Sequence, residues 1–283
     1  MRVSVTGASG YVGRHVVKAL VDQEHTVVAV GRDQLTSGVG MAGADYRVVD
    51  VFDENINVFH AIGAPDVCIH LAWQAGFNHQ DPAHIGNMMK HYRLIEKLIA
   101  NGLKHLAVAG SMHEIGYHVG EVTDKTPANP LNPYGVAKNF LRQALTLLCE
   151  KNNVDFKWLR MYYIHGDDRI NNSIFSKLLT AEAEGKETFP LNSGEMLYDF
   201  IEVSRLGVQI ALASTQPDYH GVINCSSGEP VALRTMVERF IETNKLKIRP
   251  EYNKFPRRSY DSYAIWGNAD IALALERKAG VRA

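Results

Sequence analysis

The chain has 283 residues, of which 46% are hydrophobic and 22% are charged, so it is long enough for one large domain or two lobes around a substantial core. Its formal net charge of -1 argues against a nucleic-acid or anionic-membrane partner, because those partners select a broad positive field. No apolar run is long enough to span a membrane, and the chain begins with a strand rather than a signal peptide, which predicts a cytoplasmic protein that handles a small ligand.

The first 160 residues alternate short β-branched segments with longer segments of helical periodicity. The strand segments are apolar throughout, which is typical of strands buried on both faces of a parallel sheet. This alternation predicts an α/β protein with a Rossmann-like, doubly wound parallel sheet. Strands are predicted at 2–6, 26–31, 46–50, 66–72, 105–111 and 155–163, and helices at 11–23, 54–63, 81–102 and 132–151.

After about residue 165 the alternation becomes less regular. Helices are predicted at 172–185 and 232–244, with loops rich in Pro, Gly and Asn between them. We expect a dinucleotide-binding lobe at 1–165 that also receives about 200–225. The remainder, 166–283, is expected to form a smaller mixed α/β lobe that binds the substrate.

The junction between the first strand and the first helix is rich in glycine. A turn of this composition lets the backbone approach a pyrophosphate, which then faces the free N–H groups of the helix N-terminus. A plain strand-to-helix turn is the alternative, but the position at the first βα junction favours a dinucleotide site. The predicted cofactor-binding residues here are Gly7, Ser9, Gly10, Tyr11 and Gly13.

The end of the second strand indicates which dinucleotide is bound. Gly31 stands where an acidic residue would accept hydrogen bonds from the ribose of NAD, and Arg32 follows it. Because a guanidinium binds a 2′-phosphate, this pattern favours NADP, although the neighbouring Asp33 keeps NAD open. Asp50 and Val51, at the end of the third strand, are candidates for contacting adenine, and a solvated Asp is the alternative.

Tyr134 and Lys138 are four residues apart on a predicted helix and therefore lie on one face of it. A free phenol has a pKa near 10, and we expect the ammonium of Lys138 to lower it so that Tyr134 can exchange protons with a carbonyl oxygen. Ser111 ends the fifth strand, where its hydroxyl could orient that oxygen. His113, two residues later, is a rival acid or base. A surface lysine beside a half-buried tyrosine is the alternative interpretation of the pair.

The segments "TGASGYVG", "HLAW", "AGSMHEIGY", "NPYGVAKN" and "YDFIEV" together resemble the extended short-chain dehydrogenase/reductase family over residues 1 to about 245. Within it, the chain resembles the nucleotide-sugar branch, and most closely the dTDP-4-keto-6-deoxyhexose reductases of the dTDP-6-deoxytalose or dTDP-fucose type. Among the departures from the family pattern, Ile115 and Tyr198 replace a usual Tyr and a usual Arg.

The resemblance implies roles for further residues. Leu71 and Ala72, in the "HLAW" segment, would line the cofactor, and Asn87 would anchor a proton-relay water. Trp73 replaces a small residue and would wall the sugar pocket or pack on the nicotinamide side. The candidate substrate-binding residues are Trp73, His113, Asn172 at a helix start, Phe189 as a stacking platform for the base, and Arg257, which with Arg258 could neutralise a phosphate.

The leading functional hypothesis is NAD(P)H-dependent reduction of the 4-keto group of a nucleotide-linked 6-deoxyhexose, with Tyr134 as the proton donor. An NAD-dependent 4-epimerase would use the same residues, and a non-catalytic NAD(P)-binding sensor is the third alternative. The scattered histidines predict no metal site. The helices that carry Asn87 and Tyr134 resemble the pair through which family members dimerise, so we expect a homodimer.

Overall fold

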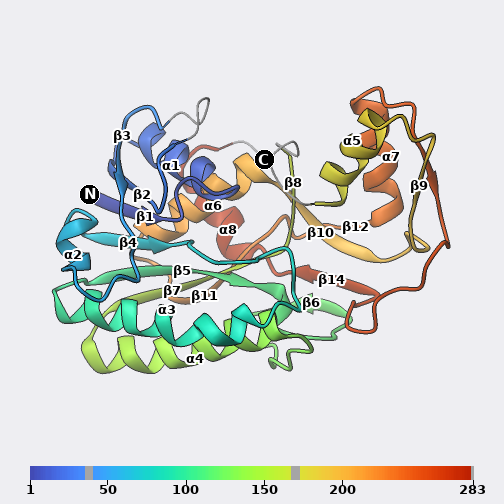
Figure 1. The fold of residues 1–283 in the computed structure, drawn as a ribbon. Helices are drawn as coiled ribbons and strands as arrows, with labels where there is room; N and C mark the ends of the chain where they lie inside the picture. Colours follow the sequence, from blue (N-terminus) through green and yellow to red (C-terminus); the bar gives the residue numbers. More distant parts are fainter. Residues whose placement is uncertain (36–40, 167–172, 282–283) are drawn as a thin grey trace.

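The computed structural model describes residues 1–35, 41–166 and 173–281. Its largest sheet joins seven of the described strands, all parallel, in the order β11-β7-β5-β4-β1-β2-β3 (Figure 1). The order reverses between β1 and β4, which is where doubly wound sheets bind their ligands. The predicted fold class is confirmed. The strands are β1 (Arg2–Thr6), β2 (Thr26–Gly31), β3 (Ala44–Val48), β4 (Val67–His70), β5 (His105–Ser111), β7 (Asp155–Met161) and β11 (Gly221–Cys225).

Helices cover both faces of this sheet, and each layer buries its own apolar core (Figure 1). One face is covered by α1 (Gly13–Asp22), α6 (Val203–Thr215) and α8 (Asp270–Lys278). The other face is covered by α2 (Val58–Ala61), α3 (Ala83–Ala100) and α4 (Pro133–Asn152). The central strands are buried along most of their length because apolar side chains point into both layers.

A second, smaller lobe has its own core and its own sheet. Its sheet has the order β12-β10-β14-β6, and β8 pairs with β10. A separate pair, β13 and β9, lies beside α5 and α7 (Figure 1). The elements are β6 (Gly120–Val122), β8 (Tyr163–His165), α5 (Ile174–Ala183), β9 (Thr188–Pro190), β10 (Leu197–Glu202), β12 (Pro230–Ala232), α7 (Leu233–Thr243), β13 (Arg249–Glu251) and β14 (Ala264–Gly267).

The structure differs from the sequence predictions where the chain passes between the two sheets. The segment expected to be one strand over 155–163 is divided, because β7 ends at Met161 and β8 pairs in the other sheet. The expected helix over 54–63 shortens to the four residues of α2. We propose that 1–165 and about 200–225 form the first lobe, except that β6 and β8 pair in the second sheet, and that α8 packs on the first lobe. In the described parts of the chain, no helix is both long enough and apolar enough to cross a membrane.

Candidate functional site

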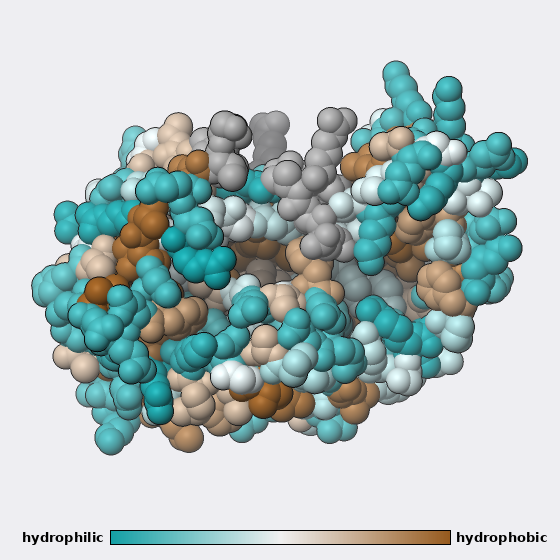
Figure 2. Space-filling view, in the orientation of Figure 1, coloured by the Kyte–Doolittle hydropathy of each residue, from teal (hydrophilic) through white to brown (hydrophobic). Residues whose placement is uncertain are grey.

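A cavity of about 1230 Å³ lies at the carboxyl ends of β1, β2, β4 and β5 and extends to the second lobe. Figure 2 shows the hollow between the part built on the large sheet and the part that carries α5 and α7. Both lobes supply lining residues, from the β1–α1 turn at one end to β9 and β10 at the other. Its volume exceeds the range of about 300–1,000 Å³ that is usual for a pocket that holds one small ligand.

The β1–α1 turn forms the wall at the first end of the cavity. Gly7 has a φ of +72°, and a Cβ atom added there would lie 2.7 Å from the amide nitrogen of Ala72, so only glycine fits. This contact packs the turn against the end of β4 and leaves backbone N–H groups of the helix start beside the cavity. The predicted cofactor-binding residues Gly7, Ser9, Gly10, Tyr11, Gly13, Leu71 and Ala72 all lie on this wall.

The ends of β2 and β3 continue this wall. Arg32 lies on it and pairs with Asp33, with 3.3 Å between Nη2 and Oδ2, and both side chains are more than three-quarters exposed. The Asp50 carboxylate accepts a hydrogen bond from the backbone N–H of Phe52 at 3.0 Å, and Val51 is buried. A glycine turn at a helix start, followed by charged and polar groups at the next two strand ends, fits the diphosphate and adenosine of a dinucleotide.

The start of α4 places the tyrosine of the predicted pair. The side chain of Asn132 caps the helix by accepting a hydrogen bond from the Gly135 N–H at 2.8 Å. A Cβ atom at Gly135 would lie 2.2 Å from the carbonyl oxygen of His113, so the glycine allows the helix to pack directly on the segment after β5. This packing brings Tyr134 close to Ser111, whose side chain acts to lower the pKa of the phenol.

Tyr134 and Lys138 share one face of α4, are 8% and 2% exposed, and line the cavity. Burial raises the pKa of Tyr134 to about 12, which outweighs the lowering effect of the Ser111 hydrogen bond. Burial lowers the pKa of Lys138 to about 7, and the negative charge of Glu114 opposes that shift. The expected net lowering of the Tyr134 pKa is therefore wrong for this structure, because the loss of solvation is the larger effect.

The ammonium of Lys138 contacts two groups. It donates a hydrogen bond to the carbonyl oxygen of Ala109 at 2.7 Å, and it lies 3.7 Å from the centroid of the Trp73 ring. The centroid of the Tyr134 ring is 5.8 Å from the same nitrogen. The sequence left open which side Trp73 would pack on, and the structure places its indole against the lysine of the pair.

Several imidazoles surround Tyr134. The ring of His79 is stacked on the phenol, with 5.2 Å between centroids and 12° between planes, and the His113 ring lies 3.9 Å from that of His79. Burial lowers the pKa of His79 to about 4 and that of His113 well below 6.5, so both rings are neutral at pH 7. The ring of His84 lies 5.0 Å from that of Tyr134, measured between centroids. The sequence analysis did not identify His79 or His84. His79 lies in the irregular segment after β4, and His84 lies at the start of α3.

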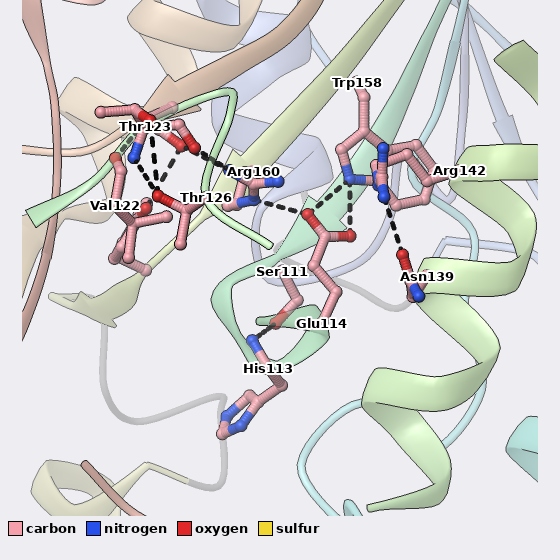
Figure 3. A network of polar contacts seen from close by, with 12 residues as sticks. Ser111, His113, Glu114, Val122, Thr123, Thr126, Asn139, Arg142, Trp158 and Arg160 are labelled. Atoms are coloured by element: carbon pink, nitrogen blue, oxygen red, sulfur yellow. Dashed lines mark hydrogen bonds and ion pairs between the residues drawn. The ribbon is translucent and has the colours of Figure 1, made fainter. Parts of the chain in front are cut away.

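A buried ion pair supports the segment that carries Ser111. The 3₁₀ turn η1 (Met112–Glu114) begins immediately after it, and Ser111 caps the turn by accepting a hydrogen bond from the His113 N–H. The carboxylate of Glu114 accepts hydrogen bonds from Arg160 Nε at 2.5 Å and from Trp158 Nε1 at 2.8 Å, and all three side chains are almost completely buried (Figure 3). Glu114 thus joins η1 to β7 beneath the cavity.

At the far end of the cavity the structure corrects one predicted residue. Arg257 does not line the cavity, because its guanidinium lies over the Tyr263 ring, 4.3 Å from the centroid. Its neighbour Arg258 lines the cavity and pairs with Asp261, with 2.8 Å between Nε and Oδ2. Phe189 also lines this end, whereas Asn172 falls outside the described residues.

Asn87 lies on α3 beside the cavity. Its side-chain amide donates a hydrogen bond to Gln74 Oε1 at 3.0 Å, and its role with a relay water stays a prediction. Over residues 1–35, 41–166 and 173–281, no three His, Cys, Asp or Glu side chains gather closely enough to hold a metal ion.

Comparisons with known proteins agree with this geometry. Residues 3–225 match the model of the NAD dependent epimerase/dehydratase family. A dTDP-6-deoxy-L-talose 4-dehydrogenase (NAD(+)) from Aggregatibacter actinomycetemcomitans is 48% identical over 272 residues, which cover 94% of this chain and 99% of that protein. The solved structure of MoeE5 in complex with UDP-glucuronic acid and NAD has a TM-score of 0.82 and 25% identity, covering 97% of this chain and 92% of that one.

A further solved structure, the UDP-glucose 4-epimerase of Thermus thermophilus in complex with NAD, covers the whole of this chain and 94% of its own, with a TM-score of 0.83. At 21% identity it supports the fold alone. The family model spans well over half of the sequence, and the 48% identical relative matches it almost from end to end. The chain therefore belongs to the NAD-dependent epimerase/dehydratase family of extended short-chain dehydrogenases/reductases, and it is an oxidoreductase of the nucleotide-sugar branch.

Proposed function

We propose that the protein reduces the 4-keto group of a dTDP-linked 6-deoxyhexose with NADH, using Tyr134 as the proton donor. The observation that carries this proposal is the placement of Ser111, Tyr134 and Lys138 in one cavity that also receives the β1–α1 glycine turn and residues of the second lobe. The similarity to a protein named dTDP-6-deoxy-L-talose 4-dehydrogenase (NAD(+)) supports the choice of sugar position and nucleotide.

When bound, the dinucleotide supplies hydride to the carbonyl carbon. Tyr134 gives its phenolic proton to the carbonyl oxygen, and the Ser111 hydroxyl, which lines the same cavity, donates a hydrogen bond to that oxygen and stabilises the charge that develops there. The ammonium of Lys138, on the same face of α4, stabilises the phenolate that remains.

At a pKa of about 12 the phenol of Tyr134 carries its proton at neutral pH before the substrate binds, so it can serve as the donor. Reduction leaves the phenolate and oxidation starts from it, so this pKa affects the two directions alike. The preference for a 4-position oxidoreductase over a 4-epimerase rests on the similarity to a protein named as a 4-dehydrogenase.

The test is to mix the protein with dTDP-, UDP- and GDP-linked 4-keto-6-deoxy sugars and to follow NADH and NADPH absorbance. We expect stoichiometric NADH consumption with the dTDP-linked sugar. Interconversion of 4-hydroxy sugars without net consumption of added cofactor would assign the epimerase alternative. Cofactor binding with no turnover on any sugar would assign the sensor.

We propose NAD rather than NADP as the cofactor, which revises the preference drawn from Arg32 alone. The carboxylate of Asp33 lies on the same cavity wall as the guanidinium of Arg32 and pairs with it. The two charges cancel, so this pair has no net positive charge with which to attract a 2′-phosphate. The name of the 48% identical relative specifies NAD(+), which points the same way.

Asp33→Asn should shift the ratio of kcat/KM for NADH and NADPH toward NADPH by about tenfold, because it removes a charge that repels the 2′-phosphate. Arg32→Ala should shift the ratio the other way. Both effects should shrink in high salt, since these side chains are exposed. Steady-state kinetics with both cofactors checks this, and a ratio that neither variant changes would contradict the assignment.

At the substrate end, we propose that Arg258 rather than Arg257 meets the diphosphate of the sugar nucleotide. Arg258 lines the cavity, and its pairing with buried Asp261 holds it in place through Nε. Its terminal guanidinium nitrogens can then approach a phosphate. Phe189, on β9, offers the flat surface on which the base could stack.

We also propose a homodimer formed through α3 and α4. Five apolar side chains on these helices are between 37% and 68% exposed, and Figure 2 shows hydrophobic residues along the face over both helices. Their spacing of four and seven residues places them along one side of each helix. They are Ile85, Met89, Val136, Phe140 and Leu147.

Phe140→Glu combined with Leu147→Glu should convert the dimer to a monomer, because burial of two carboxylates in an apolar interface is strongly unfavourable. Light scattering should give twice the chain mass for the wild type and the single chain mass for the variant. Val119→Glu, at an equally exposed apolar residue outside these helices, serves as the matched control and should stay dimeric. A monomeric wild type would refute the dimer.

A further inference from the structure

We propose that Trp73 is a positioning residue for Lys138: a clamped indole whose π face holds the ammonium of the catalytic pair in place and keeps it charged. The inference rests on the proposed function for its catalytic consequence, but its physical content, a cation held on an aromatic face, can be measured separately. Trp73 touches Lys138 directly, with 3.7 Å between Nζ and the ring centroid.

The indole is fixed by a hydrogen bond at its edge. Trp73 Nε1 donates to His84 Nδ1 at 3.0 Å, and because an indole nitrogen can only donate, His84 Nδ1 must be the acceptor. The proton of His84 therefore sits on Nε2, which donates to the carbonyl oxygen of Asn78 at 2.8 Å. His84 is 1% exposed, so this chain of donors and acceptors is shielded from competing water.

The face of the indole is supported by a second chain of contacts. The imidazole of His91 stacks on Trp73, with 4.4 Å between centroids and 19° between planes. His91 in turn hydrogen-bonds with His70 at 2.8 Å, and His70 with Thr6 at 2.7 Å. Residues of α3, β4 and β1 thus fix the position of the indole that contacts the lysine.

A buried ammonium needs such support. On the elements packed around it, Lys138 faces Glu114 on η1, Tyr134 on its own helix, His70 on β4 and His91 on α3. Both of these histidines are neutral at pH 7 because burial lowers their pKa values, so Glu114, which is engaged with Arg160, is the anion among these neighbours. Besides the Ala109 carbonyl, the Trp73 face is the direct contact that favours the charged form.

The sign of the effect follows from the charge. Lys138 is protonated below its pKa of about 7 and loses its charge as the pH rises through that value. Removal of the aromatic face destabilises only the charged form, so the pKa must fall further. Trp73→Leu should lower it by about one unit, and Trp73→Phe, which keeps a weaker face, should recover about half of that shift.

The experiment measures the pKa of Lys138 by NMR in full-length protein with 13Cε-labelled lysine, the resonance being assigned by its loss in Lys138→Met. The wild type is compared with Trp73→Leu, Trp73→Phe, His84→Phe and the double variant Trp73→Leu/His84→Phe. His84→Phe should lower the pKa less than Trp73→Leu does, and the double variant should match Trp73→Leu, because His84 acts through the indole. Trp266→Leu, at a tryptophan on β14, is the matched control and should leave the pKa unchanged.

The kinetic consequence is a second, separate readout. In a plot of kcat/KM against pH, the alkaline limb should shift to lower pH by the same number of pH units as the NMR pKa. The activity at pH 8 should therefore fall about tenfold in Trp73→Leu and be partly restored in Trp73→Phe. An unchanged NMR pKa in a folded Trp73→Leu variant overturns the inference. A lowered pKa in a protein that reduces no 4-keto sugar supports the aromatic clamp and rejects the proposed function instead.

Discussion

Replacement of Tyr134 by phenylalanine should lower kcat by about 10³-fold, within the 10²–10⁴ range expected for loss of a positioned proton donor. The phenyl ring keeps the packing against His79 and His84, so the cavity keeps its shape. Only the phenolic hydroxyl is lost. Steady-state kinetics with a 4-keto sugar nucleotide measures the loss, and fluorescence titration should show an unchanged Kd for NADH.

The matched control is Tyr219→Phe, at a partly buried tyrosine that packs on the core beside α6 and does not line the cavity. Its kcat should stay near that of the wild type. If Tyr134→Phe kept more than about a tenth of the wild-type kcat, the proton would have to come from another group, and the neutral imidazoles of His79 and His113 would be the next candidates.

Replacement of Glu114 by alanine should lower the free energy of unfolding by about 3–5 kcal/mol, because it leaves the guanidinium of Arg160 buried without its partner charge. The two side chains are completely buried, and the Glu114 carboxylate also accepts the hydrogen bond of the Trp158 indole. Glu114→Gln, which keeps one acceptor, should cost less. Urea denaturation followed by circular dichroism measures both differences.

The control for this prediction is Glu187→Ala, which removes a carboxylate that is 87% exposed in its ion pair with Arg249. Its free energy of unfolding should stay within about 0.5 kcal/mol of the wild type. A Glu114→Ala variant as stable as that control would show that the buried pair contributes nothing to stability. Because η1 begins directly after Ser111 and ends at Glu114, the variant should also lose activity at temperatures where it remains folded.

The sequence was sufficient for those parts of the fold in which local pattern and burial agree. The strands of the first lobe are apolar and short, the helices α1, α3 and α4 have clear helical periodicity, and the glycine turn stands at the first βα junction. The sequence predicted each of them within a few residues. The segment 155–163, which contains β7 and the start of β8, was predicted as one strand because local pattern does not reveal which sheet a strand joins.

Two features of the site could not be predicted from sequence for physical reasons. Which of two adjacent arginines faces the cavity depends on the path of an irregular loop, and Asp261 and Tyr263 direct Arg258 and Arg257 to different sides. The direction of the Tyr134 pKa shift depends on two opposed effects: burial raises the pKa, and a nearby cation would lower it. The extent of burial is known only from the folded structure.

The most direct measurement uses NADH carrying deuterium on the transferred position of nicotinamide C4, together with a dTDP-linked 4-keto-6-deoxyhexose, and locates the label in the sugar by NMR and mass spectrometry. We predict one deuterium per product molecule, at sugar C4, formed rapidly by the wild type and about a thousand times more slowly by Tyr134→Phe. Product without deuterium at C4, or equal rates for the two proteins, would contradict hydride transfer assisted by the Tyr134 proton.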